Sequence, residues 1–164
     1  MKKILLLLLC TTTVFAQGKL AADYKKLIGQ KYTDENGIID LKTFRNEQGV
    51  VVGKLAADRR FLSTINVYKK GNTAIVLLSK MIHPALNEYR IIDMLKVVSI
   101  PKNYEIRISD CSRKLAYPDE TIVAVVFLGT TRKVKIIKEA FALKDICFEK
   151  IATKGIQCIN EGID

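Results

Sequence analysis

One stretch late in the chain, Thr121 to Leu128, constrains the fold more than any other segment. It reads TIVAVVFL, which is almost uniformly apolar and rich in β-branched side chains. Such residues favour an extended backbone, and an apolar run of this length is typical of a central strand that is covered on both faces. The sequence therefore predicts a β-sheet with this segment in its middle.

Other strand candidates lie on both sides of this segment. Ser63–Tyr68 and Thr73–Leu78 are short runs that flank a Lys-Lys-Gly-Asn turn, and together they predict a β-hairpin. Tyr104–Ser109 alternates apolar and polar side chains, as a half-buried strand does. The remaining strand candidates are residues 49–53, 134–143 and 146–151.

Two segments carry apolar residues at helical spacing. The first, Lys19–Ile28, is followed by Gly29, a common helix stop. The second begins near Ala85, after Pro84, which suits the first turn of a helix, and Pro101 follows its end. Its apolar stripe consists of Tyr89, Ile91, Ile92, Leu95 and Val98. The expected fold class is α+β: an antiparallel β-sheet with one or two helices packed on it.

The first sixteen residues have the layout of a secretory signal peptide. Two lysines precede an apolar stretch, and the segment ends in Val-Phe-Ala at Ala16, which suits cleavage before Gln17. Cys10 could instead be the lipidated residue of a lipoprotein. Leu9 argues against that alternative, because a lipoprotein site needs a small residue before its cysteine.

This layout sets the expected domain organisation. Residues 1–16 would be a signal peptide, and residues 17–164 would form one globular domain. No later segment is long and apolar enough to cross a bilayer, so we expect no transmembrane segment in the mature chain. The mature protein would then be periplasmic or secreted.

Three cysteines remain after cleavage, so one internal disulfide can form and one thiol is left over. Cys147 stands between isoleucine and phenylalanine, which indicates a buried thiol on a strand. Three pairings are possible from the sequence. A bridge from Cys111 to Cys158 is favoured, because it would hold the C-terminal tail against the domain.

The mature chain is basic, since loss of the two leader lysines lowers the formal charge only from +10 to +8. Four cations lie close together with no acid between them: Arg132, Lys133, Lys135 and Lys138. They are the candidates for contact with an anionic macromolecule or an acidic envelope protein. No nucleic-acid-binding module is visible, which argues against nucleic acid as the partner.

The position of these cations depends on the predicted strand over residues 134–143. Side chains two residues apart share a face of a strand. We therefore expect Lys133 and Lys135 to lie on the same face as Ile137 and Phe141, with Arg132 on the other face.

Several possible sites fail on their residues. Asp34–Asp40 resembles the middle of a calcium loop, but Tyr32 and Thr43 stand where the loop needs acidic ligands, so a turn is expected. His83 is the only histidine, and it precedes Pro84 at a predicted helix start, which favours a structural role. We expect no metal site and no cofactor, because the scattered cysteines lack zinc-ligand spacing and no phosphate-binding loop is present.

The function suggested by these features is that of an exported, non-catalytic binding or accessory module rather than an enzyme. The alternative is a small hydrolase that uses paired carboxylates such as Glu105, Asp110 or Glu139. The segments EYRIIDML, SDC and KGIQCINEG also make Glu88 to Gly162 similar to a group of small exported bacterial proteins of uncharacterised function. This resemblance implies an exported domain with a cysteine-bearing tail, and it brings no activity or site residues.

Overall fold

The structure is a computed structural model that describes residues 24–52, 62–113, 122–134, 136–144 and 146–160. Within these residues the named elements are β-strands and 3₁₀ helices of three residues each. The α+β prediction is therefore wrong, because the fold is all-β. The predicted signal peptide lies outside the described residues.

Five strands form the first sheet, in the spatial order β1-β5-β4-β3-β2, with every neighbouring pair antiparallel. The predicted hairpin is confirmed as β3 and β4, and Gly71 in its turn has φ +59°, a conformation that glycine adopts without steric cost. The strands are β1 (Lys31–Tyr32), β2 (Arg45–Val52), β3 (Ser63–Lys70), β4 (Thr73–His83) and β5 (Glu88–Val97).

The described connections of the first sheet contain three short 3₁₀ helices. They are η1 (Glu35–Gly37), η2 (Ile39–Leu41) and η4 (Pro84–Leu86). The Asp34 side chain accepts a hydrogen bond of 2.9 Å from the Asn36 amide and so caps η1. The segment that resembles a calcium loop is thus a compact turn at its start.

Four antiparallel strands form the second sheet, in the order β10-β9-β8-β6. They are β6 (Tyr104–Ile108), β8 (Ile122–Phe127), β9 (Ile137–Lys144) and β10 (Cys147–Ile151), and all four were predicted as strands. As expected from its composition, β8 lies inside the sheet, and its first five residues are buried. A separate pair, β7 (Cys111–Ser112) and β11 (Gln157–Cys158), completes the fold.

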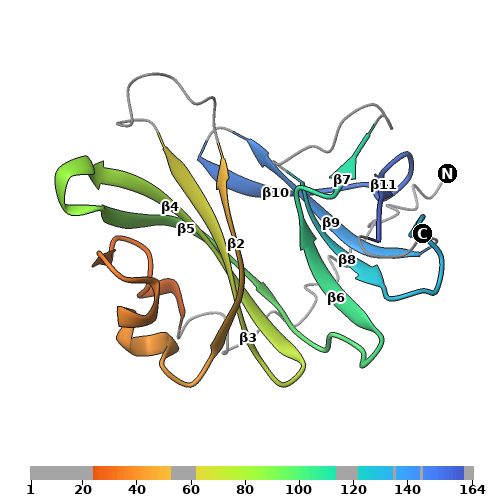
Figure 1. Cartoon of the computed structure of the whole chain (residues 1–164), viewed down its shortest axis with the longest axis horizontal. Coiled ribbons are helices and arrows are strands. Elements are labelled where there is room, and N and C mark those ends of the chain that lie inside the picture. Colours follow the sequence, from red (N-terminus) through yellow and green to blue (C-terminus); the bar gives the residue numbers. More distant parts are fainter. Residues whose placement is uncertain (1–23, 53–61, 114–121, 135, 145, 161–164) are drawn as a thin grey trace, which may run out of the picture.

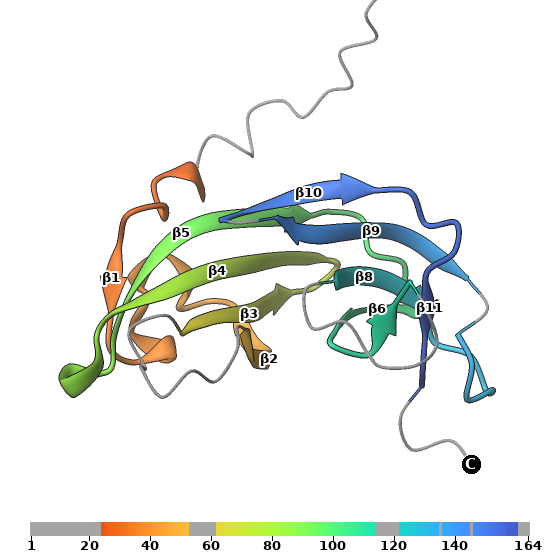
Figure 2. The same cartoon turned by 90° about the horizontal axis from the view of Figure 1, so that it is seen from above.

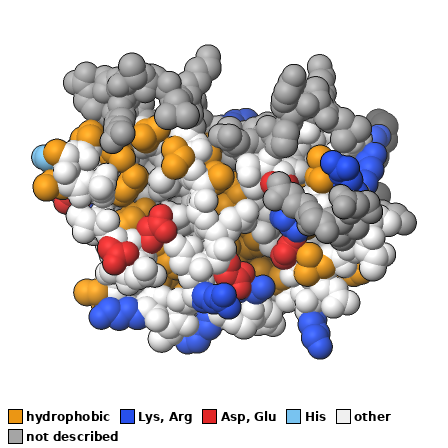
Figure 3. Space-filling model, in the orientation of Figure 1, with side chains coloured by type: hydrophobic (Ala, Val, Ile, Leu, Met, Phe, Trp, Pro, Cys, Tyr) orange, Lys and Arg blue, Asp and Glu red, His pale blue; other side chains and the backbone are white. Residues whose placement is uncertain are grey.

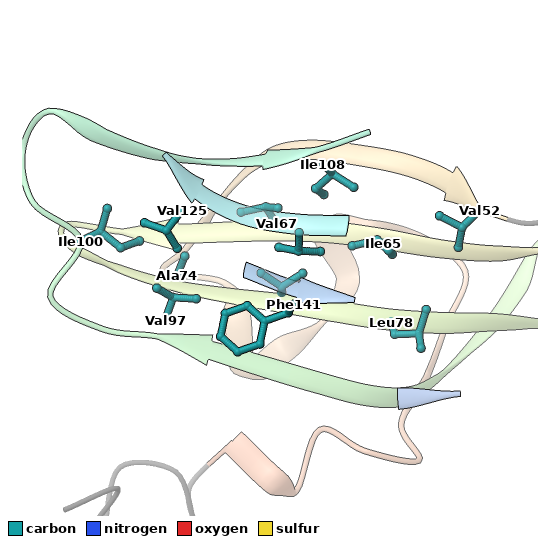
Figure 4. Packing of buried hydrophobic residues seen from close by; sticks show 12 residues of the cluster. Val52, Ile65, Val67, Ala74, Leu78, Val97, Ile100, Ile108, Val125 and Phe141 are labelled. Carbon is teal, nitrogen blue, oxygen red and sulfur yellow. The ribbon is translucent and has the colours of Figure 1, made fainter. Parts of the chain in front are cut away.

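The two sheets share one hydrophobic core. Figure 1 shows the first sheet in the left half of the molecule and the second in the right half, and Figure 2 shows the same arrangement from above. Alternate side chains of β3 and β4, such as Ile65, Val67 and Leu78, pack with Ile108 and Phe141 of the second sheet (Figure 4). Burial of apolar surface between the inner faces is therefore what joins the sheets.

Each sheet also buries part of its outer face. The segment 24–44 covers part of the first sheet, where Leu27 and Leu41 pack on Tyr68, Ile75 and other strand residues. On the second sheet, the β7–β11 pair and Ile156 pack on the outward side chains of β8. The central strands are consequently buried on both sides, which explains their nearly continuous apolar sequences.

The helix predicted from about Ala85 is instead strand β5. This strand pairs with β4 along its length, but Leu78 pairs with Asp93 while Ser79 pairs with Ile91, so Ile92 is an extra residue in a β-bulge. Ile91 packs in the outer cluster and Ile92 packs against the inner core. The bulge shifts the two-residue period, and the resulting three- and four-residue steps imitate a helix.

The other predicted helix, Lys19–Ile28, lies largely outside the described residues. Its described end is helical at Tyr24 and Lys25 and continues as turns, in which the Leu27 backbone amide donates to the Tyr24 carbonyl at 2.9 Å. None of the helical segments in the described part of the chain has the length and hydropathy of a membrane span.

Candidate functional site

The structure confirms the predicted disulfide but not the predicted burial of the third cysteine. Cys111 and Cys158 form a disulfide between β7 and β11, and both are fully buried. The prediction of a buried Cys147 is wrong, because this thiol is exposed. Cys147 is the first residue of β10, and β10 is the edge of its sheet, so its apolar neighbours do not enclose it.

Of the four predicted cations, the structure describes three, and these three make contacts with different parts of the fold. Arg132 and Lys133 are exposed beside the C-terminal segment, where the Asn160 amide donates to the Arg132 carbonyl at 2.6 Å. Lys138 instead extends to the connection between β5 and β6, and its Nζ donates to the Ser99 carbonyl at 3.2 Å. Lys135 lies outside the described residues.

A β-bulge explains why the expected arrangement of this strand is wrong. Val125 pairs with Glu139 and Val126 pairs with Ile137, so Lys138 is the extra residue. Ile137 therefore packs on the outer face of the second sheet, whereas Phe141 lies in the core between the sheets. A bulge redirects the side chain at its position, and here it sends Lys138 toward Ser99.

Ser99, whose carbonyl accepts the Lys138 hydrogen bond, lines an open hollow where the two sheets are connected. The hollow has a volume of about 540 Å³ and is bounded by the β3–β4 turn and the β5–β6 connection. These two segments come together at the lower edge of Figure 1, where the Ile100 amide donates to the Asn72 carbonyl at 2.9 Å. We call it the lysine hollow; its lining residues are Lys69, Gly71, Asn72, Ser99, Ile100, Pro101, Lys102 and Tyr104.

The backbone around the lysine hollow is locally constrained. Ser99 has φ +56°, a left-handed conformation that is uncommon outside glycine. The Lys138 hydrogen bond to its carbonyl and the adjoining Ile100 hydrogen bond hold this turn. Sparsely populated backbone conformations persist where surrounding contacts enforce them, and they are frequent at binding sites.

The charge at the lysine hollow is mostly positive. Lys69 and Lys102 line it, and Lys138 contributes a third ammonium group at Ser99. Glu47, which occupies a bulge in β2, offsets part of this charge, since its carboxylate lies 3.6 Å from Lys69 Nζ. Lys102 is exposed and makes no ion pair with any residue that the structure describes. The arrangement can hold an anionic group by charge and by ammonium hydrogen bonds.

The carboxylates proposed for a hydrolase are engaged with cations. Arg107 contacts Glu105 through Nε and Asp110 through Nη1, the second contact at 3.2 Å. Glu139 lies 3.8 Å from Lys150 Nζ. The pKa of another carboxyl, Asp40, is lowered by hydrogen bonds from Lys26 and Gln30, which is opposite to what a general acid requires. Among the described residues, no group of three or more His, Cys, Asp and Glu side chains is placed to hold a metal ion.

Sequence reasoning found only one residue at the edge of this hollow, Lys138. It noted Lys69 as part of a hairpin turn, and it gave no role to Ser99, Lys102 or Tyr104. These residues come from β3, the β5–β6 connection, β6 and β9, which meet only after both sheets have formed. The available sequence signal for the hollow was a run of two lysines before a Gly-Asn turn. That signal did not show which other elements would lie beside the turn.

In comparisons with protein-family models, with curated proteins and with solved structures, the chain matches none of them.

Proposed function

We propose that this protein is an exported, non-catalytic binding module that holds an anionic group of a macromolecule in the lysine hollow. The observation that carries the proposal is that Lys69 and Lys102 line one open hollow while Lys138, from a third element, reaches the Ser99 carbonyl at its edge. Carboxylate, phosphate or sulfate groups of an acidic protein or an envelope polyanion have the required charge. The hollow is open to solvent, so a single group of a long polymer can enter it from outside.

Export is supported by the disulfide between Cys111 and Cys158, because such bonds persist in oxidising compartments. It is supported also by the sequence of residues 1–16. The exported protein should have the intact mass of a chain that begins at Gln17. A mass that includes acyl chains on Cys10 would contradict this.

The binding proposal is tested with dextran sulfate as a soluble polyanion probe. The double variant Lys69→Gln/Lys102→Gln should bind about tenfold or more weakly than the wild type in titrations at low salt, because two charge-assisted contacts are removed. The matched control is Lys80→Gln/Lys154→Gln, which removes the same charge from exposed lysines outside the lysine hollow. This control should bind within about twofold of the wild type.

Two results would overturn the proposal. Equal losses in both double variants would mean that the probe senses net charge and not the lysine hollow. Absence of binding by the wild type at low salt, where exposed charges interact most strongly, would remove the proposed function altogether.

A further inference from the structure

The lysine hollow is larger than one anionic group requires. Its volume of about 540 Å³ lies in the range of pockets that hold whole small molecules. A carboxylate or sulfate group in contact with the lysines fills only part of that space. The chemistry of the remaining wall therefore indicates what else is bound there together with the charge.

Part of the wall is apolar. Ile100, Pro101 and Tyr104 line the lysine hollow beside the lysines. Pro101 is exposed and Tyr104 is half-buried, so both leave surface for a ligand. The Tyr104 ring packs edge-on against the Phe127 ring, with the ring centroids 5.4 Å apart, and this contact fixes its position. Apolar surface next to ammonium groups favours a ligand that has an apolar face and a negative charge on the same small unit.

The lysine hollow also has neutral hydrogen-bonding groups. The Asn72 side chain is exposed and makes no hydrogen bond with the residues that the structure describes, and the same holds for the Tyr104 hydroxyl. A side-chain amide and a phenol each donate and accept hydrogen bonds. The hydroxyl groups of a ligand do both as well, whereas a carboxylate only accepts. These two groups therefore complement a ligand that carries hydroxyls in addition to its charge.

Backbone hydrogen bonds hold this wall in place. The Tyr104 amide donates to the Pro101 carbonyl at 2.9 Å, which closes a four-residue turn with Lys102 at its second position. The Leu128 amide donates to the Asn103 carbonyl at 2.8 Å and ties the turn to the end of β8. A preformed wall loses little conformational freedom on binding, and a rigid ligand adds little further loss. The wall thus suits a ligand built on a rigid ring.

Positive charge continues outside the lysine hollow. Figure 3 shows lysine and arginine side chains along the lower edge of the view, where Figure 1 places the β3–β4 turn. A polymer of acidic units can follow this edge while one of its units enters the hollow, because the charge along the edge attracts the neighbouring units.

We propose that the lysine hollow binds one sugar unit of an acidic saccharide chain, an inference that deepens the function proposed above and rests on it. The carboxylate or sulfate group of the unit contacts Lys69 and Lys102. The C–H face of the sugar ring packs on Tyr104, and its hydroxyls exchange hydrogen bonds with Asn72. An acidic peptide can use the lysines, but it has no hydroxyl-bearing ring for the rest of the hollow.

Two matched pairs of ligands test the sugar ring at equal charge, in calorimetric titrations of the full mature protein at low salt. Tetragalacturonate is compared with tetraglutamate that has blocked termini, since both carry one carboxylate per unit and only the first has sugar rings. Dextran sulfate is compared with polyvinyl sulfate in the same way. In at least one pair the saccharide should bind about tenfold or more tightly than its sugar-free counterpart, and that pair identifies the acidic group.

Variants of the wall separate the ring contact from the charge. Tyr104→Leu and Asn72→Ala should each weaken binding of the preferred saccharide about fivefold to tenfold and leave the sugar-free ligand unchanged. Tyr104→Phe keeps the ring and its packing on Phe127, so it should keep most of the saccharide affinity. Asn103→Ala is the matched control for Asn72→Ala, because Asn103 is exposed on the same wall without lining the hollow, and it should bind like the wild type.

This inference fails separately from the proposed function. Equal affinities within both pairs, with binding still lost in Lys69→Gln/Lys102→Gln, would leave a site for any anionic polymer and overturn the sugar unit. Tighter binding of tetraglutamate than of tetragalacturonate would assign the hollow to an acidic protein instead. A saccharide preference that survives in both Tyr104→Leu and Asn72→Ala would place the saccharide elsewhere on the surface. Failure of every ligand to bind the wild type would overturn both proposals.

Discussion

At the scale of single residues, Tyr68 shows how burial of one polar side chain affects stability. Its hydroxyl donates to the Glu35 carbonyl at 2.8 Å while the ring packs in the outer cluster of the first sheet. Burial raises the pKa of this hydroxyl, and nearby Tyr32 and Glu35 raise it further. The folded state therefore holds the Tyr68 proton more tightly than the unfolded chain does.

This predicts a loss of stability at alkaline pH. The unfolded chain releases the Tyr68 proton near its ordinary pKa of 10.0, so the stabilisation is complete below that pH and decreases as the pH rises above it. Tyr68→Phe should lower the free energy of unfolding by about 1 kcal/mol at neutral pH through loss of the hydrogen bond. In denaturant titrations, the variant should also show a shallower decrease above pH 10.0 than the wild type. Parallel curves would contradict this account.

At the scale of elements, the disulfide between β7 and β11 is expected to stabilise the fold strongly. It joins cysteines that are 47 residues apart, and closing a loop of this length is worth about 4 kcal/mol in the chain-entropy model. Cys111→Ala/Cys158→Ala should therefore lower the free energy of unfolding by about 2–4 kcal/mol in denaturant titrations. Cys147→Ser serves as the control, because the exposed thiol should contribute little. Non-reducing peptide maps that join Cys147 to either of the other cysteines would contradict the pairing.

The elements also show which parts of the fold the sequence can predict. Local signals were sufficient for the β3–β4 hairpin, whose Gly-Asn turn is short, and for β8, whose β-branched composition suits a buried strand. They failed at β5, because the bulge at Ile92 changes the spacing of apolar residues. The position of a bulge is determined by how the strand pairs with its neighbour. The sequence of one segment does not show that pairing, so the bulge could not be predicted from it.

Prediction of the disulfide and of the lysine hollow from the sequence was limited in the same way. The Cys111–Cys158 bridge could be chosen from the sequence because it would hold the C-terminal tail. The lysine hollow could not be predicted, because Lys69 and Lys102 line it and Lys138 reaches its edge from elements that are distant in sequence.

At the scale of the whole molecule, the two sheets are joined by more than their shared core. The backbone amide of Phe148 on β10 donates to Asp93 Oδ2 on β5 at 2.6 Å. Asp93 pairs with Leu78, a core residue, so its side chain is on the side of the first sheet that faces the second. This single hydrogen bond therefore links the edge of one sheet to a strand of the other.

Removing this link should loosen one side of the molecule without unfolding it. Asp93→Ala leaves the Phe148 amide without its charged acceptor, and it should lower the free energy of unfolding by about 1–3 kcal/mol. Asp93→Asn retains a carbonyl acceptor, so its effect should be smaller. Glu149→Ala on the same strand is the control, since its carboxylate is exposed and its ion pair among the described residues is with Lys144.

Amide hydrogen exchange locates the effect. The Phe148 amide should exchange faster in Asp93→Ala than in the wild type, while amides of β3 and β4, in the interior of the first sheet, should exchange at rates that follow only the global loss of stability. Equal acceleration at every amide would mean that Asp93 acts on overall stability and not on the contact between β5 and β10. Unchanged exchange at Phe148 would show that packing between the sheets holds β10 without this hydrogen bond.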